Sequence, residues 1–178
     1  MTAADSILIR SCAVSDIERH LPQLAGLLQA CVHDGASIGF ILPFTLPEST
    51  AFWMQNVLPA VQRGRRLLLV AEQEGQIVGT VQLDWDSPAN QQHRAEVRKL
   101  MVSPDYRRRG IARLLMQEVE ARARQMPRSL LTLDTRTDDN AEPLYVSLGY
   151  TMAGVIPGYA LAVDHSGLDA TTIMYKQL

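Results

Sequence analysis

The sequence predicts an α/β fold, with one domain built around a mixed β-sheet. The chain has 178 residues, a length that fits one domain spanning residues 1–178, and no repeat, low-complexity tract or Gly/Ser linker divides it. Apolar residues make up 47% and charged residues 20%, which is typical of a globular protein with a buried core. Strand-like and helix-like segments alternate in the order β-α-α-β-β-β-α-β-α-β-β.

The N-terminal third predicts one strand and two helices. "ILIR" (7–10) is typical of a short strand, and residues 16–31 carry apolar side chains every three or four positions, as an amphipathic helix does despite an early proline. Residues 33–44 contain two glycines and a proline and predict a loop. A second helix is expected to begin near Pro47, with Pro59 bending or ending its first piece.

The middle of the chain predicts a hairpin followed by a strand–helix–strand unit. "RLLLVAE" (66–72) and "QIVGTVQLDW" (76–85) flank a short turn and predict antiparallel partners. Residues 94–103 and 129–135 predict two further strands, joined by an amphipathic helix. A right-handed crossover makes these two strands parallel neighbours. A short helix at 141–149 and two late strands complete the order.

Charge is distributed unevenly along the chain. The net charge is −2, which does not favour non-specific nucleic-acid binding. Residues 94–124 hold nine Lys or Arg against four Asp or Glu, a local charge of +5 that leaves −7 for the remainder. A basic segment on a mildly acidic protein favours a compact anionic ligand over a long polyanion.

Targeting and metal signals are lacking in the sequence. Cys12 and Cys31 are too few for a disulfide framework and lack metal-ligand spacing, so we expect no metal. The first 16 residues lack a basic start followed by an apolar stretch, which argues against a signal peptide. No segment approaches the ~18 apolar residues of a membrane span. We therefore expect a cytoplasmic protein with no membrane partner.

The basic segment contains "YRRRGIARLLMQEVEARARQ" (106–125), in which three arginines and Gly110 precede a helix. The start of a helix presents N–H groups without intrahelical partners, and a glycine there leaves room for an anion. Arginine adds several donors and a permanent charge. The alternative is a solvated charged surface. Neither G-x-x-x-x-G-K-[ST] nor G-x-G-x-x-G is present, so commoner phosphate loops are excluded.

The pattern Arg107-x-x-Gly110-x-Ala112 after a strand resembles the coenzyme A motif of the GNAT superfamily of N-acetyltransferases, and the likeness covers roughly residues 94–160. The resemblance implies a sheet of about seven strands, with splayed parallel strands 4 and 5, flanked by about four helices. It implies acetyl-CoA as cosubstrate, with its pyrophosphate on the main chain of the turn and its pantetheine along the preceding strand. The implied cofactor-binding residues are Leu100, Met101, Val102, Arg107, Arg108, Arg109, Gly110, Ile111, Ala112 and Asn140. Asn140 departs from the family pattern, in which an asparagine often stands where this chain has Asp138.

"HDGASIGF", "RAEVRKLMV" and "LLTLDT" are similar to segments of the tabtoxin resistance proteins, a branch of this superfamily that acetylates a small amino-acid-like toxin. This likeness implies transfer of acetyl to a primary amine of a small molecule by direct attack on the thioester. It also implies His33, Asp34 and Ser37 of the 33–40 loop as substrate contacts. An acceptor amine on a protein or peptide, and a CoA-binding sensor without catalysis, are the alternatives. A nucleic-acid-binding module is the weakest of the alternative functions. For the assembly, the resemblance implies a homodimer as one possibility.

Acetyl transfer requires a neutral amine, so a base must accept a proton at neutral pH. Glu96 and Asp134 lie on the strands expected to flank the thioester. They match positions that act as the base in the tabtoxin resistance branch. The alternative is that each carboxylate only pairs with a nearby arginine. Tyr145 aligns with the general acid of many relatives and protonates the thiolate, unless it is a plain core aromatic. A covalent acetyl-cysteine route is disfavoured because neither cysteine lies on those strands.

Overall fold

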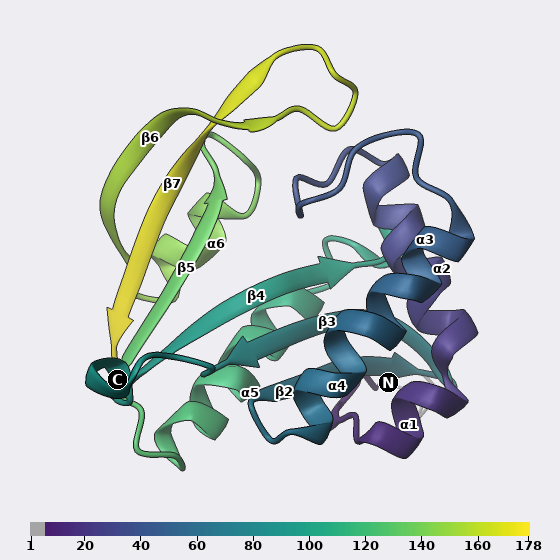
Figure 1. Cartoon of the computed structure of the whole chain (residues 1–178), viewed down its shortest axis with the longest axis horizontal. Helices are drawn as coiled ribbons and strands as arrows, with labels where there is room; N and C mark the ends of the chain where they lie inside the picture. The colour runs from purple at the N-terminus through teal and green to yellow at the C-terminus, as the bar shows by residue number, and fades with distance from the viewer. Residues whose placement is uncertain (1–5) are drawn as a thin grey trace.

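The computed structural model describes residues 6–178 and contains one seven-stranded mixed sheet (Figure 1). The strand order is β1-β2-β3-β4-β5-β7-β6, with every neighbouring pair antiparallel except β4 and β5. The strands are β1 (Leu8–Ser11), β2 (Arg66–Gln73), β3 (Gln76–Asp84), β4 (Arg94–Val102), β5 (Leu130–Arg136), β6 (Thr151–Leu161) and β7 (Leu168–Gln177). The expectation about a signal peptide rests partly on residues 1–5, which lie outside the described residues.

Helices cover both faces of the sheet, and each face has its own apolar core. They are α1 (Val14–Arg19), α2 (Leu21–His33), α3 (Leu46–Phe52), α4 (Leu58–Gln62), α5 (Ile111–Arg124) and α6 (Glu142–Ser147). Helices α1–α4 pack on one face, where Trp53 and Leu68 are fully buried, and α5 packs on the other, where Leu115 and Leu131 are fully buried (Figure 1). No helix within residues 6–178 has the length and apolarity needed to cross a bilayer.

The α/β fold class and the parallel β4–β5 unit are confirmed, but two predicted helices are divided. The helix expected at 16–31 is two helices, because Pro22 occupies the second position of α2. Pro59 likewise lies at the second position of α4 and does not end a helix there; a π-helical segment, Trp53–Val57, joins α3 to α4. Proline has no N–H to donate and is tolerated in the first turn. Residues 6–178 therefore form six α-helices in place of about four.

Strands β4 and β5 separate after a short ladder. Their paired residues run from Arg94↔Leu130 only as far as Glu96↔Thr132, so the second half of each strand lacks the other as a partner. β4 also carries a bulge, because two of its residues, Lys99 and Leu100, lie opposite one residue of β3. Lys99 has φ 51°, which is uncommon for a residue with a side chain. The splayed strands predicted by resemblance are thus present, whereas the bulge was not predicted.

Candidate active site

The turn before α5 has the main-chain geometry of an anion site. Gly110 caps the helix with φ 81° and offers no side-chain cap, and Arg108 has φ 61°. The first helical hydrogen bond runs from the N–H of Leu114 to Gly110 O (3.1 Å), and the N–H groups of residues 111–113 have no acceptor within residues 6–178. A Cβ added at Gly110 would meet no atom within 4 Å, so the approach to these donors is open. Such a helix start binds phosphate.

The three arginines of this turn are exposed but have different partners. Arg107 forms an ion pair with Asp34 and donates from Nε to Val102 O (3.4 Å). Arg109 donates to Asp105 O (3.0 Å) and its guanidinium lies 4.8 Å from the centre of the Tyr106 ring. The side chain of Arg108 has no partner within residues 6–178. The run is therefore partly engaged by protein groups.

The strand and loop residues expected near the pantetheine lie around the splay of β4 and β5. Leu100 and Val102 pack against the α5-side core and Met101 is buried on the opposite face, so their side chains are used in packing. Their main chain lies beyond the last β4–β5 pair. Asn140 is exposed just before α6, and its N–H contacts Asp139 Oδ1 (2.6 Å).

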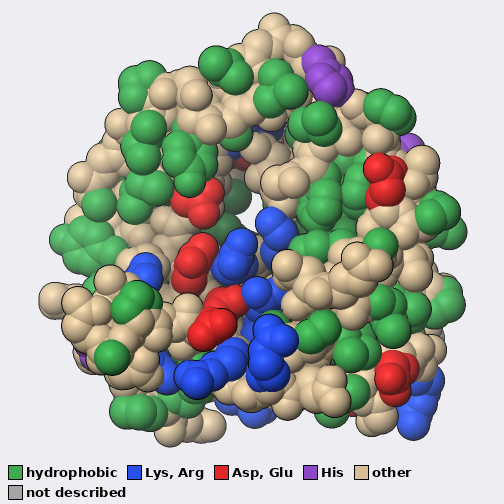
Figure 2. Space-filling model, in the orientation of Figure 1, with side chains coloured by type: hydrophobic (Ala, Val, Ile, Leu, Met, Phe, Trp, Pro, Cys, Tyr) green, Lys and Arg blue, Asp and Glu red, His purple; other side chains and the backbone are tan. Residues whose placement is uncertain are grey.

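A line of charged residues crosses the sheet on the α1–α4 side. Arg66, Asp84 and Glu96 are paired across β2, β3 and β4, and Asp134 lies two residues beyond the Glu96 partner on β5. Because register partners and alternate residues share a face, these four side chains lie on the same face. We call them, with Arg98, the charged tract. Figure 2 shows acidic and basic side chains gathered around the hollow in the middle of this view.

The two candidate bases are in different electrostatic environments. Glu96 Oε1 lies 3.6 Å from Arg98 Nε, and the same arginine lies 3.8 Å from Asp84 Oδ2. Asp134 is exposed and has no ion pair within residues 6–178, because Arg136 instead contacts Asp139 (3.3 Å) and Asp169 (3.9 Å). Asp134 is therefore the carboxylate that is free to accept a proton.

Tyr145 is a buried phenol beside this carboxylate. Its ring packs 5.9 Å from that of Tyr150, and the hydroxyl makes no hydrogen bond within residues 6–178. Burial raises the pKa of the Tyr145 hydroxyl, and the charge of Asp134 raises it further. The phenol is thus protonated at neutral pH, the state in which a tyrosine can donate a proton.

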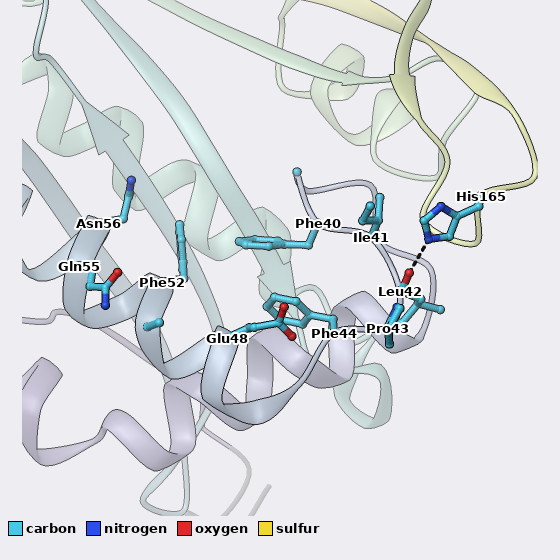
Figure 3. Close-up of a pocket in the computed structure, with 12 residues that line it drawn as sticks. Phe40, Ile41, Leu42, Pro43, Phe44, Glu48, Phe52, Gln55, Asn56 and His165 are labelled. Carbon is cyan, nitrogen blue, oxygen red and sulfur yellow. Dashed lines mark hydrogen bonds between the residues drawn. The ribbon is translucent and has the colours of Figure 1, made fainter.

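An apolar groove of about 750 Å³ lies between the 39–44 loop and α3 (Figure 3). Phe40, Phe44 and Phe52 line it, together with Glu48 and Asn56. His165, from the β6–β7 turn, closes one end, and its ring contacts Leu42 O.

The three predicted substrate contacts lie at the base of this loop. His33 Nε2 is 2.7 Å from Phe44 O, which ties the two ends of the loop together. Asp34 forms an ion pair with Arg107 and so faces the turn before α5. Ser37 is half-buried, and its side chain makes no hydrogen bond within residues 6–178. None of the three lines the 750 Å³ groove.

Lys99 is a residue of this site that sequence reasoning missed. It lies at the β4 bulge, and its Nζ donates to Ile38 O at 2.6 Å. Burial, together with the charge of Arg98, lowers its pKa to about 8 against the opposing charges of Asp134 and Glu96. A lysine in a basic strand gives no local signal of such an environment.

Neither cysteine lies on β4 or β5, although Cys31 Sγ donates to Val102 O at 3.5 Å, in the splayed half of β4. Both are buried free thiols, and burial raises the pKa of each to about 11. Such thiols are poor nucleophiles at neutral pH. Within residues 6–178 no three His, Cys, Asp or Glu side chains form a group suited to a metal ion.

Comparison with known proteins gives consistent matches. Residues 41–150 match the model of the acetyltransferase (GNAT) family. Human N-acetyltransferase 8 is 38% identical over 87 residues, which are 48% of this chain and 38% of the human protein, so the chain spans well under half of that relative. A crystal structure of ribosomal-protein-alanine N-acetyltransferase from Brucella melitensis aligns with a TM-score of 0.77 and 25% identity, over 96% of this chain and 99% of that one. A putative acetyltransferase from Salmonella typhimurium, solved with its cofactor acetyl-CoA, aligns with a TM-score of 0.75 and 20% identity, over 98% and 95% of the two chains.

Proposed function

The chain belongs to the acetyltransferase (GNAT) family, and we propose that it transfers an acetyl group from acetyl-CoA to a primary amine of a small molecule. The observation that carries the proposal is the set of unpartnered N–H groups at the start of α5, which lies directly beside the splay of β4 and β5. A diphosphate held there places the thioester arm along β4, where main-chain groups lack a β5 partner.

The cosubstrate supplies an activated acetyl group, and the protein supplies donors and proton carriers. The N–H groups of Ile111–Arg113 hold the diphosphate, with Arg107 and Arg108 adding charge. The structure with acetyl-CoA of the Salmonella protein, which shares this fold, supports the choice of nucleotide.

Proton transfer is assigned to two residues that lie near one another. Asp134 accepts the proton of the acceptor ammonium, directly or through water, because it is exposed and unpaired. Glu96, held by Arg98, orients the ammonium without losing its charge. Tyr145 gives a proton to the departing thiolate, since its hydroxyl is protonated and has no protein partner.

The size of the groove supports a small acceptor. A volume of about 750 Å³ is within the range of pockets that enclose small molecules. The finer proposal, an amino-acid-like compound or toxin as in the tabtoxin resistance branch, rests only on the quoted sequence segments. The two free cysteines support a reducing, cytoplasmic setting for the reaction.

A protein or peptide amine is the second candidate. The similarity to the Brucella ribosomal-protein-alanine N-acetyltransferase favours it. An extended peptide requires a longer contact surface than the groove alone offers. The β6–β7 turn at His165 lies next to the groove and would provide the additional surface.

A homodimer is the assembly that we propose. β6 is one of the two edge strands of the sheet, and four apolar residues of the β6–β7 arm are 42–67% exposed: Met152, Val155, Leu161 and Leu168. An exposed apolar sheet edge is a surface that a second copy can cover. Light scattering after size-exclusion chromatography, with Val155→Lys as a disrupting variant, measures this assembly; a monomer at micromolar concentration contradicts it.

Thiol release from acetyl-CoA tests the function. We expect release with at least one member of a panel of primary amines and amino acids, and none with their N-acetylated forms. Release with peptide N-termini alone would favour the second candidate. Tight binding of CoA in calorimetry without release for any acceptor would instead support a sensor.

A further inference from the structure

Lys99 occupies an unusual backbone position in the splayed half of β4. The bulge places two residues of β4 opposite one of β3, and Lys99 has φ 51°. A positive φ costs about 1–2 kcal/mol for a residue with a Cβ, and such strain is found where a side chain must be aimed. The bulge directs this side chain out of the regular ladder toward the loop after α2.

The contacts of the ammonium group are all with that loop. Nζ donates to Ile38 O at 2.6 Å and lies 5.5 Å from the centre of the Phe40 ring. A Cβ at Gly39 would lie 3.2 Å from Nζ, so glycine permits this close approach. No carboxylate within residues 6–178 comes within 4.0 Å of it, although Lys99 is half-buried. The cation is therefore not used for an ion pair.

Phe40 begins a series of ring contacts that forms the wall of the groove (Figure 3). Its ring lies 4.7 Å from that of Phe44 and 5.1 Å from that of Phe52. Phe52 in turn lies 5.6 Å from Trp53, which is fully buried in the α1–α4 core. Phe52 and Trp53 are thus fixed by packing, while Phe40 lies on a loop and depends on its contacts.

The groove continues from this wall toward the charged tract. Asn56, at its far end, accepts from Arg66 Nη1 at 2.8 Å, and Arg66 is paired with Asp84. An amine whose body lies against the rings can thus direct its nitrogen toward Glu96 and Asp134. The position of Phe40 sets how closely that body fits.

We propose that Lys99 is a positioning residue that holds Phe40 in the wall of the acceptor groove, so that the groove selects primary amines with an apolar or aromatic body. The proposal rests on the acetyltransferase function and adds the chemical class of the acceptor. Lys99 acts through the 38–40 segment and takes no part in bond making.

The charge on Lys99 makes this arrangement dependent on pH. The groups that face it are Glu96 and Arg98 on β4, Asp134 on β5 and Arg66 on β2, and the 38–40 segment carries no titratable side chain. Burial lowers the pKa to about 8, so the amine is mostly charged at pH 7 and mostly neutral at pH 9. The neutral form loses the cation–π attraction and donates a weaker hydrogen bond, so the wall loosens as pH rises.

The test compares Lys99→Met and Lys99→Arg with the unaltered protein, using 2-phenylethylamine and ethanolamine as acceptors in the thiol-release assay. At pH 7 we expect Lys99→Met to raise KM for 2-phenylethylamine roughly tenfold, with kcat changed less than about threefold. KM for ethanolamine, which lacks a ring, should change less than about threefold. Lys99→Arg keeps the charge and the donor and should restore KM for the aromatic amine.

Several outcomes would overturn the proposal. A positioning role is excluded if Lys99→Met leaves KM for 2-phenylethylamine unchanged or lowers kcat alone. It is also excluded if KM for 2-phenylethylamine in Lys99→Arg is as high as in Lys99→Met. Preference of the unaltered protein for ethanolamine contradicts the acceptor class. For the pH dependence, the KM of the unaltered protein for 2-phenylethylamine is divided by the KM of Lys99→Arg at the same pH, so that the titration of the acceptor cancels. This ratio should rise between pH 7 and pH 9. A constant ratio contradicts the pH dependence. Calorimetry with CoA is run on each variant, and absence of CoA binding by the unaltered protein would refute the proposed function, not this inference.

Discussion

The two sides of the β4–β5 splay are built in different ways. On the donor side, where we propose that the acetyl donor binds, the turn at 103–110 and the start of α5 offer main-chain N–H groups from consecutive residues. On the acceptor side, the groove combines the 39–44 loop, α3 and the β6–β7 turn, and its character comes from side chains. A site made of adjacent backbone can be recognised in a short stretch of sequence, whereas one made of distant side chains cannot.

The largest effect is expected where the two sides meet, at Asp134. Asp134→Asn removes the unpaired carboxylate but keeps its shape, so kcat should fall by about 10²–10⁴ for loss of a general base. Binding of CoA should be unaffected, because the proposed diphosphate site lies at the start of α5. Steady-state kinetics and calorimetry measure the two quantities. Glu96→Gln is the matched control, and a larger loss there than in Asp134→Asn would reverse the assigned roles.

Tyr145→Phe should have the next largest effect, lowering kcat about 10- to 100-fold with little change in KM for either substrate. The ring packing against Tyr150 is retained, and no protein hydrogen bond is lost. Thermal unfolding should therefore show an unchanged midpoint. Retention of full kcat would make Tyr145 a core aromatic only, as the alternative interpretation holds.

A change on the donor side tests whether that side is the diphosphate site. Arg107→Glu replaces a cation with an anion next to the open N–H groups, so the acetyl-CoA Kd should rise at least about tenfold, or ~1.4 kcal/mol. Calorimetry at two salt concentrations measures this, and the difference should shrink at high salt. Arg124→Glu, the same charge reversal at the C-terminal end of α5, is the control. An unchanged Kd for Arg107→Glu would refute the assigned position of the diphosphate.

The same contrast explains what could be predicted from the sequence. The order of strands and helices along the chain follows from local periodicity, and the turn before α5 is marked by Gly110, so both are visible in single segments. The division at Pro22 was missed, and Pro59 was expected to bend or end a helix although it lies in the first turn of α4, because a proline in the first turn and one that ends a helix look alike until the chain is folded. Lys99 was missed because its contact, Ile38, is 61 residues away.

The ion pair between Arg107 and Asp34 joins the two sides across 73 residues of sequence. Both side chains are more than 40% exposed, so the pair contributes at most about 1 kcal/mol to stability. A bound diphosphate competes with Asp34 for the arginine, and the carboxylate also repels it. We therefore expect the pair to oppose cosubstrate binding slightly.

Asp34→Asn should accordingly tighten CoA binding by about two- to fourfold, which is the smallest effect expected here and opposite in sign to that of Arg107→Glu. Asp105→Asn removes a charge from the same turn, and Asp105 makes no ion pair with Arg107. If both variants tighten binding equally in calorimetry, the effect is general electrostatics and the pair has no specific role. If Asp34→Asn alone tightens binding, occupancy of the donor site is linked to the loop that shapes the acceptor groove. Weaker binding in Asp34→Asn would mean that the carboxylate orients Arg107 for the diphosphate, and the two sides would then cooperate instead of competing.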